Sequence, residues 1–233
     1  YVELAGPSAS EEVATIAKLF RKHAPDCLFI IDGALSRKSQ AGSGNSEAVI
    51  LAVSAATATA PEDLAEKTSF ALSLLQAPPV EADLEEELEM AIQKHPEARA
   101  IILGEDSCKT LNLPNLVGYG QDIAKELEKG SHCLFLRGAV TEMVVKELIK
   151  SENFRNITLV VEDGTRLFIK PESYRKLQFL KVKLAVLDPL DVRLVCLNPT
   201  TGSGQAQDPL PLLEALREKI TDIPVLDLGP ANV

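Results

Sequence analysis

The chain has 233 residues, of which 45% are hydrophobic, and this suffices for one large α/β domain or two small ones. A formal net charge of -10 argues against a general nucleic-acid binder, because contacts to phosphates need a basic surface. No apolar run approaches the roughly 18 residues of a membrane span, and no signal peptide opens the chain. We therefore expect neither nucleic-acid nor membrane partners.

Cysteine and histidine usage indicates a reduced, cytoplasmic protein. The four cysteines are widely spaced and form no CxxC pair, and Cys27, Cys133 and Cys196 each lie in an apolar run, as buried thiols do. Only three histidines are present, so the sequence does not favour a zinc site. The first residue, Tyr1, is not a methionine, and we expect a fragment or a processed form.

The first predicted helix ends near His23, because a capping box and an apolar stripe of helical period precede this residue and a proline follows it. Residues 27–31 form a short apolar run without helical period, which is typical of a strand buried on both faces. Asp32 and Gly33 end this run, and small or polar side chains follow up to Ser46. Ligands in open α/β sheets bind beyond the carboxyl ends of strands, so this loop is the first candidate site.

The rest of the chain alternates between apolar runs and amphipathic stretches. Further strands are predicted at 48–53, 100–103, 132–136, 157–161, 166–169, 182–186, 192–197 and 224–228. Helices are predicted at 62–75, 83–94, 122–129, 142–150, 171–177 and 209–219, with Thr141 and Asp208 as caps. This order predicts an α/β fold with a mostly parallel sheet layered with helices.

Pro78-Pro79 marks a candidate domain boundary. It divides the chain into a first α/β half at 1–78, which contains the DGALSRKS loop, and a second α/β half at 79–233. The alternative is one continuous domain. The stretches CLFIIDGALS and CLFLRGAVT are similar, which suggests two related halves. The similarity could equally arise by chance, because a strand followed by glycine and small residues is very common in α/β proteins.

The first candidate site is the loop after residue 31. Its ligand-binding candidates are Asp32, Gly33, Ser36, Arg37, Lys38 and Ser39. Asp32 can hold a magnesium ion or orient a water, while Arg37 and Lys38 can contact phosphate or carboxylate groups. The alternative is structural: Asp32 caps the loop and the two cations are solvated.

Two other loops are weaker candidates. Thr201, Gly202 and Gly204 lie in a Gly/Ser/Thr-rich loop before a helix, where backbone N–H groups can cradle an anion, but a mobile surface loop is the favoured interpretation. Asp163 and Thr165 follow the strand 157–161 and would line the same crevice as Asp32 in a parallel sheet, although a tight turn explains them more simply. The motifs GxxxxGK[ST], GxGxxG and GxSxG are all absent.

Several of these segments together resemble a known family. FIIDGALSRKS, AVILAV and PEDLAEKT, then NITLVVEDGTRLFI and LNPTTGSGQAQDP, are similar to the accessory protein, or small reactivase subunit, that partners lysine 5,6-aminomutase. The strand FIIDG also resembles the second acidic strand of P-loop NTPases, so the resemblance implies a P-loop-NTPase-like or Rossmann-like fold without a Walker A motif. Members of the accessory family extend further at the N-terminus.

The resemblance implies an accessory subunit of an ATP-dependent complex that replaces damaged cobalamin in an adenosylcobalamin-dependent mutase. Its implied partners are a MutS-like ATPase subunit and lysine 5,6-aminomutase, and adenosylcobalamin would be met only through the partner enzyme. No catalytic residues come with the family, and we expect no intrinsic catalysis in this chain. A homo-oligomer is compatible with the sequence.

The alternative function comes from the residues themselves. Asp32, Arg37 and Lys38 could belong to a nucleotide- or phosphometabolite-binding α/β enzyme domain, with Mg-nucleotide as the cofactor. Loss of ligand binding in Asp32→Ala without loss of stability would support that function.

Overall fold

The computed structural model describes residues 10–32, 46–58 and 60–227. Helices and mostly parallel strands alternate along the chain, which confirms the predicted α/β fold. The chain divides into two compact units, each made of two segments: unit 1 is 1–46 with 77–189, and unit 2 is 47–76 with 190–233. The predicted boundary after Pro78 lies close to one passage between units. The C-terminal segment, however, joins 47–76 rather than 79–189, because its strands pair with the strand that begins at Val49.

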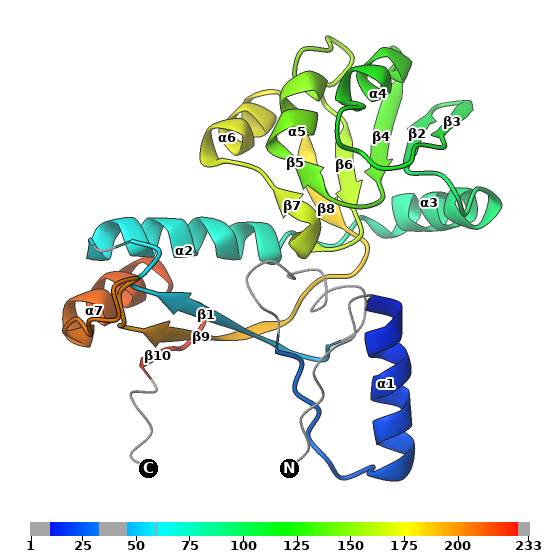
Figure 1. Ribbon diagram of the computed structural model, residues 1–233. Helices are drawn as coiled ribbons and strands as arrows, with labels where there is room; N and C mark the ends of the chain where they lie inside the picture. Colours follow the sequence, from blue (N-terminus) through cyan, green and yellow to red (C-terminus); the bar gives the residue numbers. More distant parts are fainter. Residues whose placement is uncertain (1–9, 33–45, 59, 228–233) are drawn as a thin grey trace. The chain divides into compact units, whose positions relative to one another are not determined.

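Unit 2 is a parallel sheet with two helices on one face. Its strands are β1 (Val49–Ser54), β9 (Val192–Asn198) and β10 (Val225–Asp227), in the order β1-β9-β10. Helices α2 (Pro61–Leu75) and α7 (Pro209–Lys219) follow β1 and β9 and pack on the same face (Figure 1). Buried residues from both helices form the core with β9 and β10, among them Leu64, Leu72, Leu212, Leu216, Val195, Leu197 and Val225.

The strand predicted at 48–53 is confirmed as β1, but the second face of this sheet is exposed although the run is apolar throughout. Ile50 is 61% exposed and Leu226 is 42% exposed. The register places Ile50 beside Leu194 and Leu226 beside Cys196, so apolar side chains share this face across the three strands. Among the described residues, the buried side chains of this sheet lie on the face that α2 and α7 cover, where Val49, Leu51 and Val53 of β1 are partly buried.

Unit 1 contains a five-stranded sheet in the order β3-β2-β4-β6-β8. Its strands are β2 (Ala100–Gly104), β3 (Ser107–Leu111), β4 (Ser131–Leu136), β6 (Thr158–Val161) and β8 (Lys183–Val186). β4, β6 and β8 are parallel, whereas β2 is antiparallel to both of its neighbours. A second small sheet pairs β5 (Val140–Thr141) with β7 (Leu167–Phe168).

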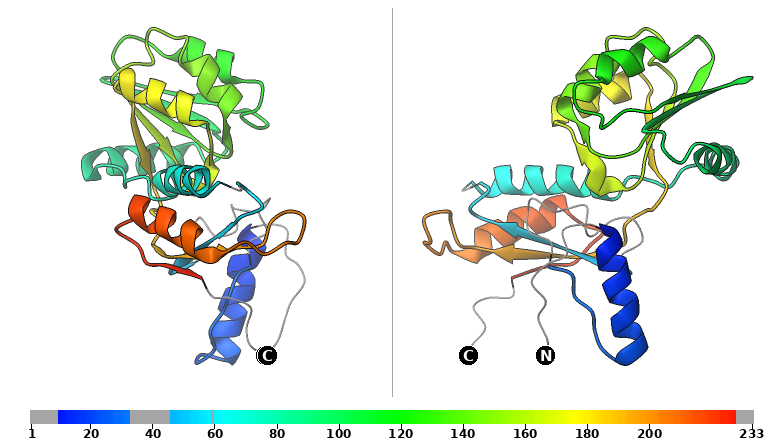
Figure 2. Two further views of the ribbon diagram at one scale, coloured as in Figure 1. Left: turned by 90° about the vertical axis from the view of Figure 1, so that its left-hand side faces the viewer. Right: turned by 45° about the vertical axis from the view of Figure 1, so that its right-hand side comes forward.

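Helices cover both faces of this sheet (Figure 2). On one face, α3 (Ala82–Lys94) packs Leu88 and Ala91 against Ile101, Leu103 and Phe135. The opposite face carries α4 (Gly120–Glu126), α5 (Glu142–Leu148) and α6 (Pro171–Phe179). Because both faces are covered, β2, β4 and β6 are nearly continuous apolar runs, which is why their sequences predicted buried strands.

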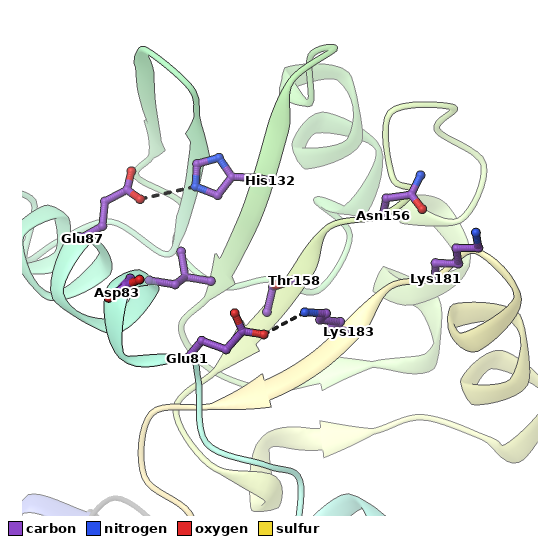
Figure 3. Close-up of a pocket in the computed structure, with 9 residues that line it drawn as sticks. Glu81, Asp83, Glu87, His132, Asn156, Thr158, Lys181 and Lys183 are labelled. Atoms are coloured by element: carbon purple, nitrogen blue, oxygen red, sulfur yellow. Dashed lines mark hydrogen bonds and ion pairs between the residues drawn. The ribbon is translucent and has the colours of Figure 1, made fainter.

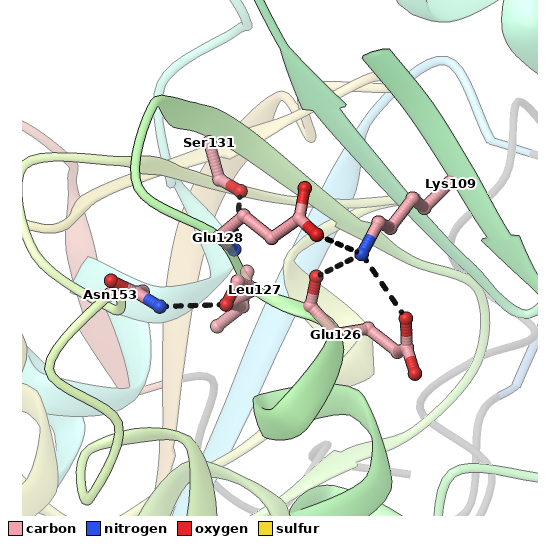
Figure 4. A network of polar contacts seen from close by, with 6 residues as sticks. All are labelled: Lys109, Glu126, Leu127, Glu128, Ser131 and Asn153. Atoms are coloured by element: carbon pink, nitrogen blue, oxygen red, sulfur yellow. Dashed lines mark hydrogen bonds and ion pairs between the residues drawn. The ribbon is translucent and has the colours of Figure 1, made fainter.

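The strand pair β2-β3 was only half predicted. β2 was predicted at 100–103, but β3 was not, and Glu105 and Asp106 form the tight turn of the hairpin between them. Lys109 ties the hairpin to the end of α4 and the residues that follow it: its Nζ lies 3.3 Å from a carboxylate oxygen of Glu126 and 2.6 Å from one of Glu128 (Figure 4). These hydrogen bonds and charges raise the pKa of Lys109, with Glu128 contributing most.

The strand predicted at 27–31 is wrong. Helix α1 (Ser10–His23) ends as expected, but the segment up to Asp32 has no regular secondary structure. Leu28 is 85% exposed and Ile30 is 76% exposed, so no sheet covers them, and Cys27 is exposed rather than buried. The apparent repeat of CLFIIDGALS in CLFLRGAVT is therefore not a repeat of strands within the described residues. In those same residues, no helix is both long and apolar enough to cross a membrane.

Candidate functional site

Asp32 does not stand at the end of a strand, which was the reason for choosing it. Its side chain is exposed, and it follows the irregular segment after α1. The other candidates of this loop, Gly33, Ser36, Arg37, Lys38 and Ser39, lie outside the described residues. Among the residues that are described, Asp32 joins no group of three His, Cys, Asp or Glu side chains that could hold a metal ion.

The loop after β9 is a tight turn in which the backbone N–H groups of Thr201 and Gly204 donate hydrogen bonds within the turn itself. Thr201 N–H donates to the Gln205 carbonyl at 2.8 Å, and Gly204 N–H donates to the Thr201 carbonyl at 2.9 Å. Gly204 has φ of 81°, which side chains disfavour, so the turn needs this glycine. Thr201, Gly202 and Gly204 thus lie together, but the amides of Thr201 and Gly204 are not offered to an anion.

The N-terminus of α7 already holds an anion from the chain itself. The Asp208 carboxylate accepts a hydrogen bond from Leu210 N–H at 3.0 Å, and Pro209 occupies the first helical position, as predicted. This carboxylate meets the positive end of the helix, where the sequence had suggested an external anion.

Asp163 and Thr165 lie together at the carboxyl end of β6, inside a buried loop. Asp163 is fully buried, and its Oδ1 accepts hydrogen bonds from the backbone N–H of Thr165 at 2.8 Å and from the Thr165 hydroxyl. Asp163 thereby caps the short helix η2 (Gly164–Arg166). These contacts favour the tight-turn interpretation over a ligand site.

The same loop contacts the carboxyl end of β4. Glu162 Oε2 accepts a hydrogen bond from Gly138 N–H at 3.1 Å and lies 3.2 Å from Arg166 Nε, which is also 3.6 Å from Asp163 Oδ2. Partial burial raises the pKa of Asp188, at the end of β8, and the charge of Asp163 raises it further. The charged side chains at this edge of the sheet therefore contact groups of the protein itself: Glu162 and Asp163 with Arg166, and Glu162 with the Gly138 backbone.

An open pocket of about 570 Å³ lies at the opposite ends of the same strands (Figure 3). Its volume is in the range of small-molecule sites. Residues at or near the starts of β4, β6 and β8 form one side, and α3 with the segment before it forms the other. The lining residues are Glu81, Asp83, Leu84, Glu87, His132, Asn156, Thr158, Lys181 and Lys183.

Charged side chains dominate this pocket, and part of their charge is paired. Lys183 Nζ lies 2.7 Å from Glu81 Oε1, which lowers the pKa of Glu81. His132 Nε2 lies 3.4 Å from Glu87 Oε2. Asp83 and Lys181 form no ion pair with any described residue. The unpaired acid, Asp83, therefore lies on α3, and the unpaired cation, Lys181, lies in the turn after α6.

Two pocket residues have unusual backbone conformations. Asn156 and Lys181 both have φ of 55°, in the left-handed region, and they are the non-glycine residues of the described chain with positive φ. Asn156 N–H donates to the Leu180 carbonyl at 3.1 Å, and Val182 N–H donates to the Leu177 carbonyl at 2.9 Å, so Lys181 ends α6 in the manner of a C-terminal cap. Glycine is the usual residue there, and lysine costs roughly 1 kcal/mol in its place.

The thiols of Cys108 and Cys133 add no reactive group to the pocket. Burial raises the pKa of the Cys133 thiol to about 12, with a further contribution from Glu87. Burial also raises the pKa of Cys108, on β3, against the opposing effect of Lys94. Cys133 is buried as predicted, and neither thiol is activated as a nucleophile.

Sequence reasoning missed the pocket because its residues are scattered over four separate stretches of the chain, and no local motif joins them. The sequence carried no such signal at Lys181, because the predicted helix ends at 177 and the left-handed conformation of Lys181 after α6 appears only in the structure. Comparison of the chain with protein-family models, with curated proteins and with solved structures gave no match.

Proposed function

We propose that this protein is the accessory subunit of an ATP-dependent complex that reactivates an adenosylcobalamin-dependent lysine 5,6-aminomutase. The observation that carries the proposal is the set of segments that resemble that family, above all FIIDGALSRKS, NITLVVEDGTRLFI and LNPTTGSGQAQDP. In this role the chain contacts a MutS-like ATPase subunit and the mutase, and cobalamin stays with the mutase.

One feature of unit 2 supports a role in binding another protein. All-parallel sheets are ordinarily covered on both faces, yet Ile50 and Leu226 lie on a face that the described residues leave exposed. Leu194, beside Ile50, extends the same apolar surface. Exposed apolar surface of this kind is typical of protein–protein contacts, and we expect a partner protein to dock there.

The acidic groups of unit 1 support the same role. Glu162 and Asp163 stand where an enzyme of this fold would hold catalytic or ligand-binding groups, at the carboxyl ends of parallel strands. Their contacts with Gly138, Thr165 and Arg166 instead hold the loop itself. This use of the acids fits a binding scaffold better than an enzyme.

The test combines the purified chain with a MutS-like ATPase of this family and with a lysine 5,6-aminomutase inactivated by damaged cobalamin. We expect a stable complex in size-exclusion chromatography with light scattering, and recovery of mutase activity that needs ATP, fresh adenosylcobalamin and this chain. No association with either protein, together with recovery that is the same without the chain, would refute the proposal.

A pair of matched variants tests the docking face. Ile50→Thr keeps a β-branched residue in β1 while it removes apolar surface, and Phe179→Ser removes an 84% exposed phenylalanine from unit 1. We expect weaker association for Ile50→Thr and unchanged association for Phe179→Ser. Equal association of Ile50→Thr and wild type would place the docking surface elsewhere.

Thermal unfolding of the chain alone tests the nucleotide-binding alternative. A ligand that binds the folded state raises its melting temperature, so Mg-ATP added to the chain alone should leave the transition unchanged for an accessory subunit. A rise that disappears in Asp32→Ala would favour a nucleotide site at Asp32, Arg37 and Lys38.

A further inference from the structure

We propose that the pocket between α3 and the amino ends of β4, β6 and β8 binds a small zwitterion, an amino acid with one ammonium and one carboxylate group. The proposal rests on unit 1 alone and does not depend on the accessory role. Its basis is the placement of charge: unpaired acid on α3 and an unpaired cation after α6, with the ion pair of Glu81 and Lys183 between them (Figure 3).

The carboxylate of the ligand belongs at the side formed by Lys181 and Asn156. Their backbones are joined through the hydrogen bond from Asn156 N–H to Leu180, so the two side chains come from adjacent turns. Lys181 lines the pocket and forms no ion pair with a described residue. An ammonium and a side-chain amide are suitable donors for one carboxylate.

Lys181 also occupies a position that favours glycine, and no described contact of its side chain compensates for the strain. Strained residues gather at ligand sites, where the side chain is needed for binding rather than for stability. A second non-glycine residue with the same φ, Asn156, lines the same side of the pocket. The coincidence of both residues at one side points to a ligand.

The ammonium of the ligand belongs at the opposite side. Asp83, in the first turn of α3, forms no ion pair with a described residue, and Glu87 follows one helical turn later. Glu87 lies 3.4 Å from His132, so Asp83 is the group left to contact a ligand cation. Thr158, between the two sides, adds a hydroxyl.

The balance of charge excludes simpler ligands. Glu81, Asp83 and Glu87 would repel a polyphosphate, and Lys181 and Lys183 would repel a simple cation. A molecule with both charges satisfies both sides at once. The distance between the ammonium and the carboxylate of the ligand then determines which amino acid the site selects.

The experiment titrates the isotope-labelled chain with a series of ω-amino acids: glycine, β-alanine, 4-aminobutyrate, 5-aminopentanoate and 6-aminohexanoate. Butyrate and butylamine serve as singly charged controls. We expect amide resonances of Asp83, Thr158 and Lys181 to shift in a saturable way with one chain length, and not with the controls. The same amino acid should raise the melting temperature by mass action.

Three variants identify the groups. Lys181→Gly removes the ammonium while it supplies the preferred cap, so we expect a melting temperature equal to or above wild type and affinity at least about tenfold weaker. Asp83→Asn should weaken binding to a similar degree. Lys129→Gly removes the same charge from an exposed loop outside the pocket and should bind as wild type does.

Each contrary result overturns a stated part. If no ω-amino acid shifts the pocket resonances, the pocket is not a zwitterion site. If butyrate binds as tightly as the amino acids, the acidic side has no role and the ligand class is wrong. If Lys181→Gly binds as wild type does, the assignment of the carboxylate to Lys181 fails. Failure to associate with a mutase or an ATPase would leave all three results unaffected.

Discussion

Asp163 shows how a single buried carboxylate can organise a loop. It is fully buried, and it accepts hydrogen bonds from the backbone and the side chain of Thr165. The guanidinium of Arg166, whose Nε lies 3.6 Å from Asp163 Oδ2, balances the negative charge of Asp163. From sequence, such an acid at a strand end can be a ligand group or a cap, and the distinction depends on contacts that only the folded loop shows.

We expect Asp163→Ala to lower the free energy of unfolding by about 1–3 kcal/mol, because the donors of Thr165 would be buried without an acceptor. Urea denaturation of wild type and variant at neutral pH measures the difference. Asp163→Asn keeps one acceptor oxygen and should cost less. A stability unchanged in Asp163→Ala, with a loss of ligand binding, would make Asp163 a site residue after all.

At the scale of elements, Glu142 joins two helices. It is the first residue of α5, and its carboxylate accepts hydrogen bonds from Lys170 N–H and from Ser173 Oγ, both at 2.8 Å, at the start of α6. Burial alone would raise the pKa of Glu142, but these hydrogen bonds and Lys146 lower it below its ordinary value of 4.5. Thr141, predicted as the cap of α5, stands in that position, but its side chain makes no capping hydrogen bond.

Because the folded-state pKa of Glu142 is lowered, its contribution to stability is present above pH 4.5 and is lost as pH falls through the lowered value. We expect Glu142→Gln to be about 1 kcal/mol less stable than wild type at pH 7 and equally stable near pH 3, by urea denaturation. Glu152→Gln, at an exposed position, is the control and should show no such dependence. A difference that persists at low pH would assign the effect to packing.

Gly120 marks the close approach of α4 and α5. A Cβ atom at this position would lie 2.9 Å from Glu147 Cβ and 3.1 Å from the Val144 carbonyl oxygen. At Gly202, in the turn after β9, the nearest atom to an added Cβ is that of Ala56 at 3.9 Å. The first contact forces the helices apart, while the second is ordinary van der Waals distance.

We therefore expect Gly120→Ala to lower the free energy of unfolding by about 1–3 kcal/mol, as overpacking does, and Gly202→Ala to change it by less than about 0.5 kcal/mol. Thermal and urea unfolding of both variants give the comparison. Equal stability of the two variants would mean that α4 and α5 shift apart without cost.

At the scale of the whole molecule, 77–189 stands between the two segments of unit 2. The core around α3 draws all its residues from this stretch, from Val80 to Leu187. The core of unit 2, by contrast, needs both Leu64 of α2 and Leu216 of α7, which lie on either side of the inserted segment.

We expect the fragment 77–189 to fold by itself, with a cooperative thermal transition by circular dichroism and dispersed amide resonances. The fragment 47–76 alone should be unfolded, because its apolar side chains have no partner strands or helices. An unfolded 77–189 would show that its core depends on residues outside this stretch.

The sequence by itself determined the α/β class, most helix bounds and the interior strands. Runs such as 100–103 and 157–161 are apolar throughout because helices cover both faces of their sheet, and the Asp208-Pro209 start of α7 follows from local capping chemistry. These features depend on neighbours in the chain or on simple burial, and both leave a periodic signal.

The tertiary structure alone decided which strands pair, which faces are covered and which charges meet. Residues 27–31 and 48–53 are both apolar runs, yet within the described residues only the second pairs with another strand, β9, which lies far along the chain. The pocket likewise joins α3 to the starts of three strands and to Lys181. Such long-range pairings depend on the shape and register of whole elements, and no local pattern encodes them.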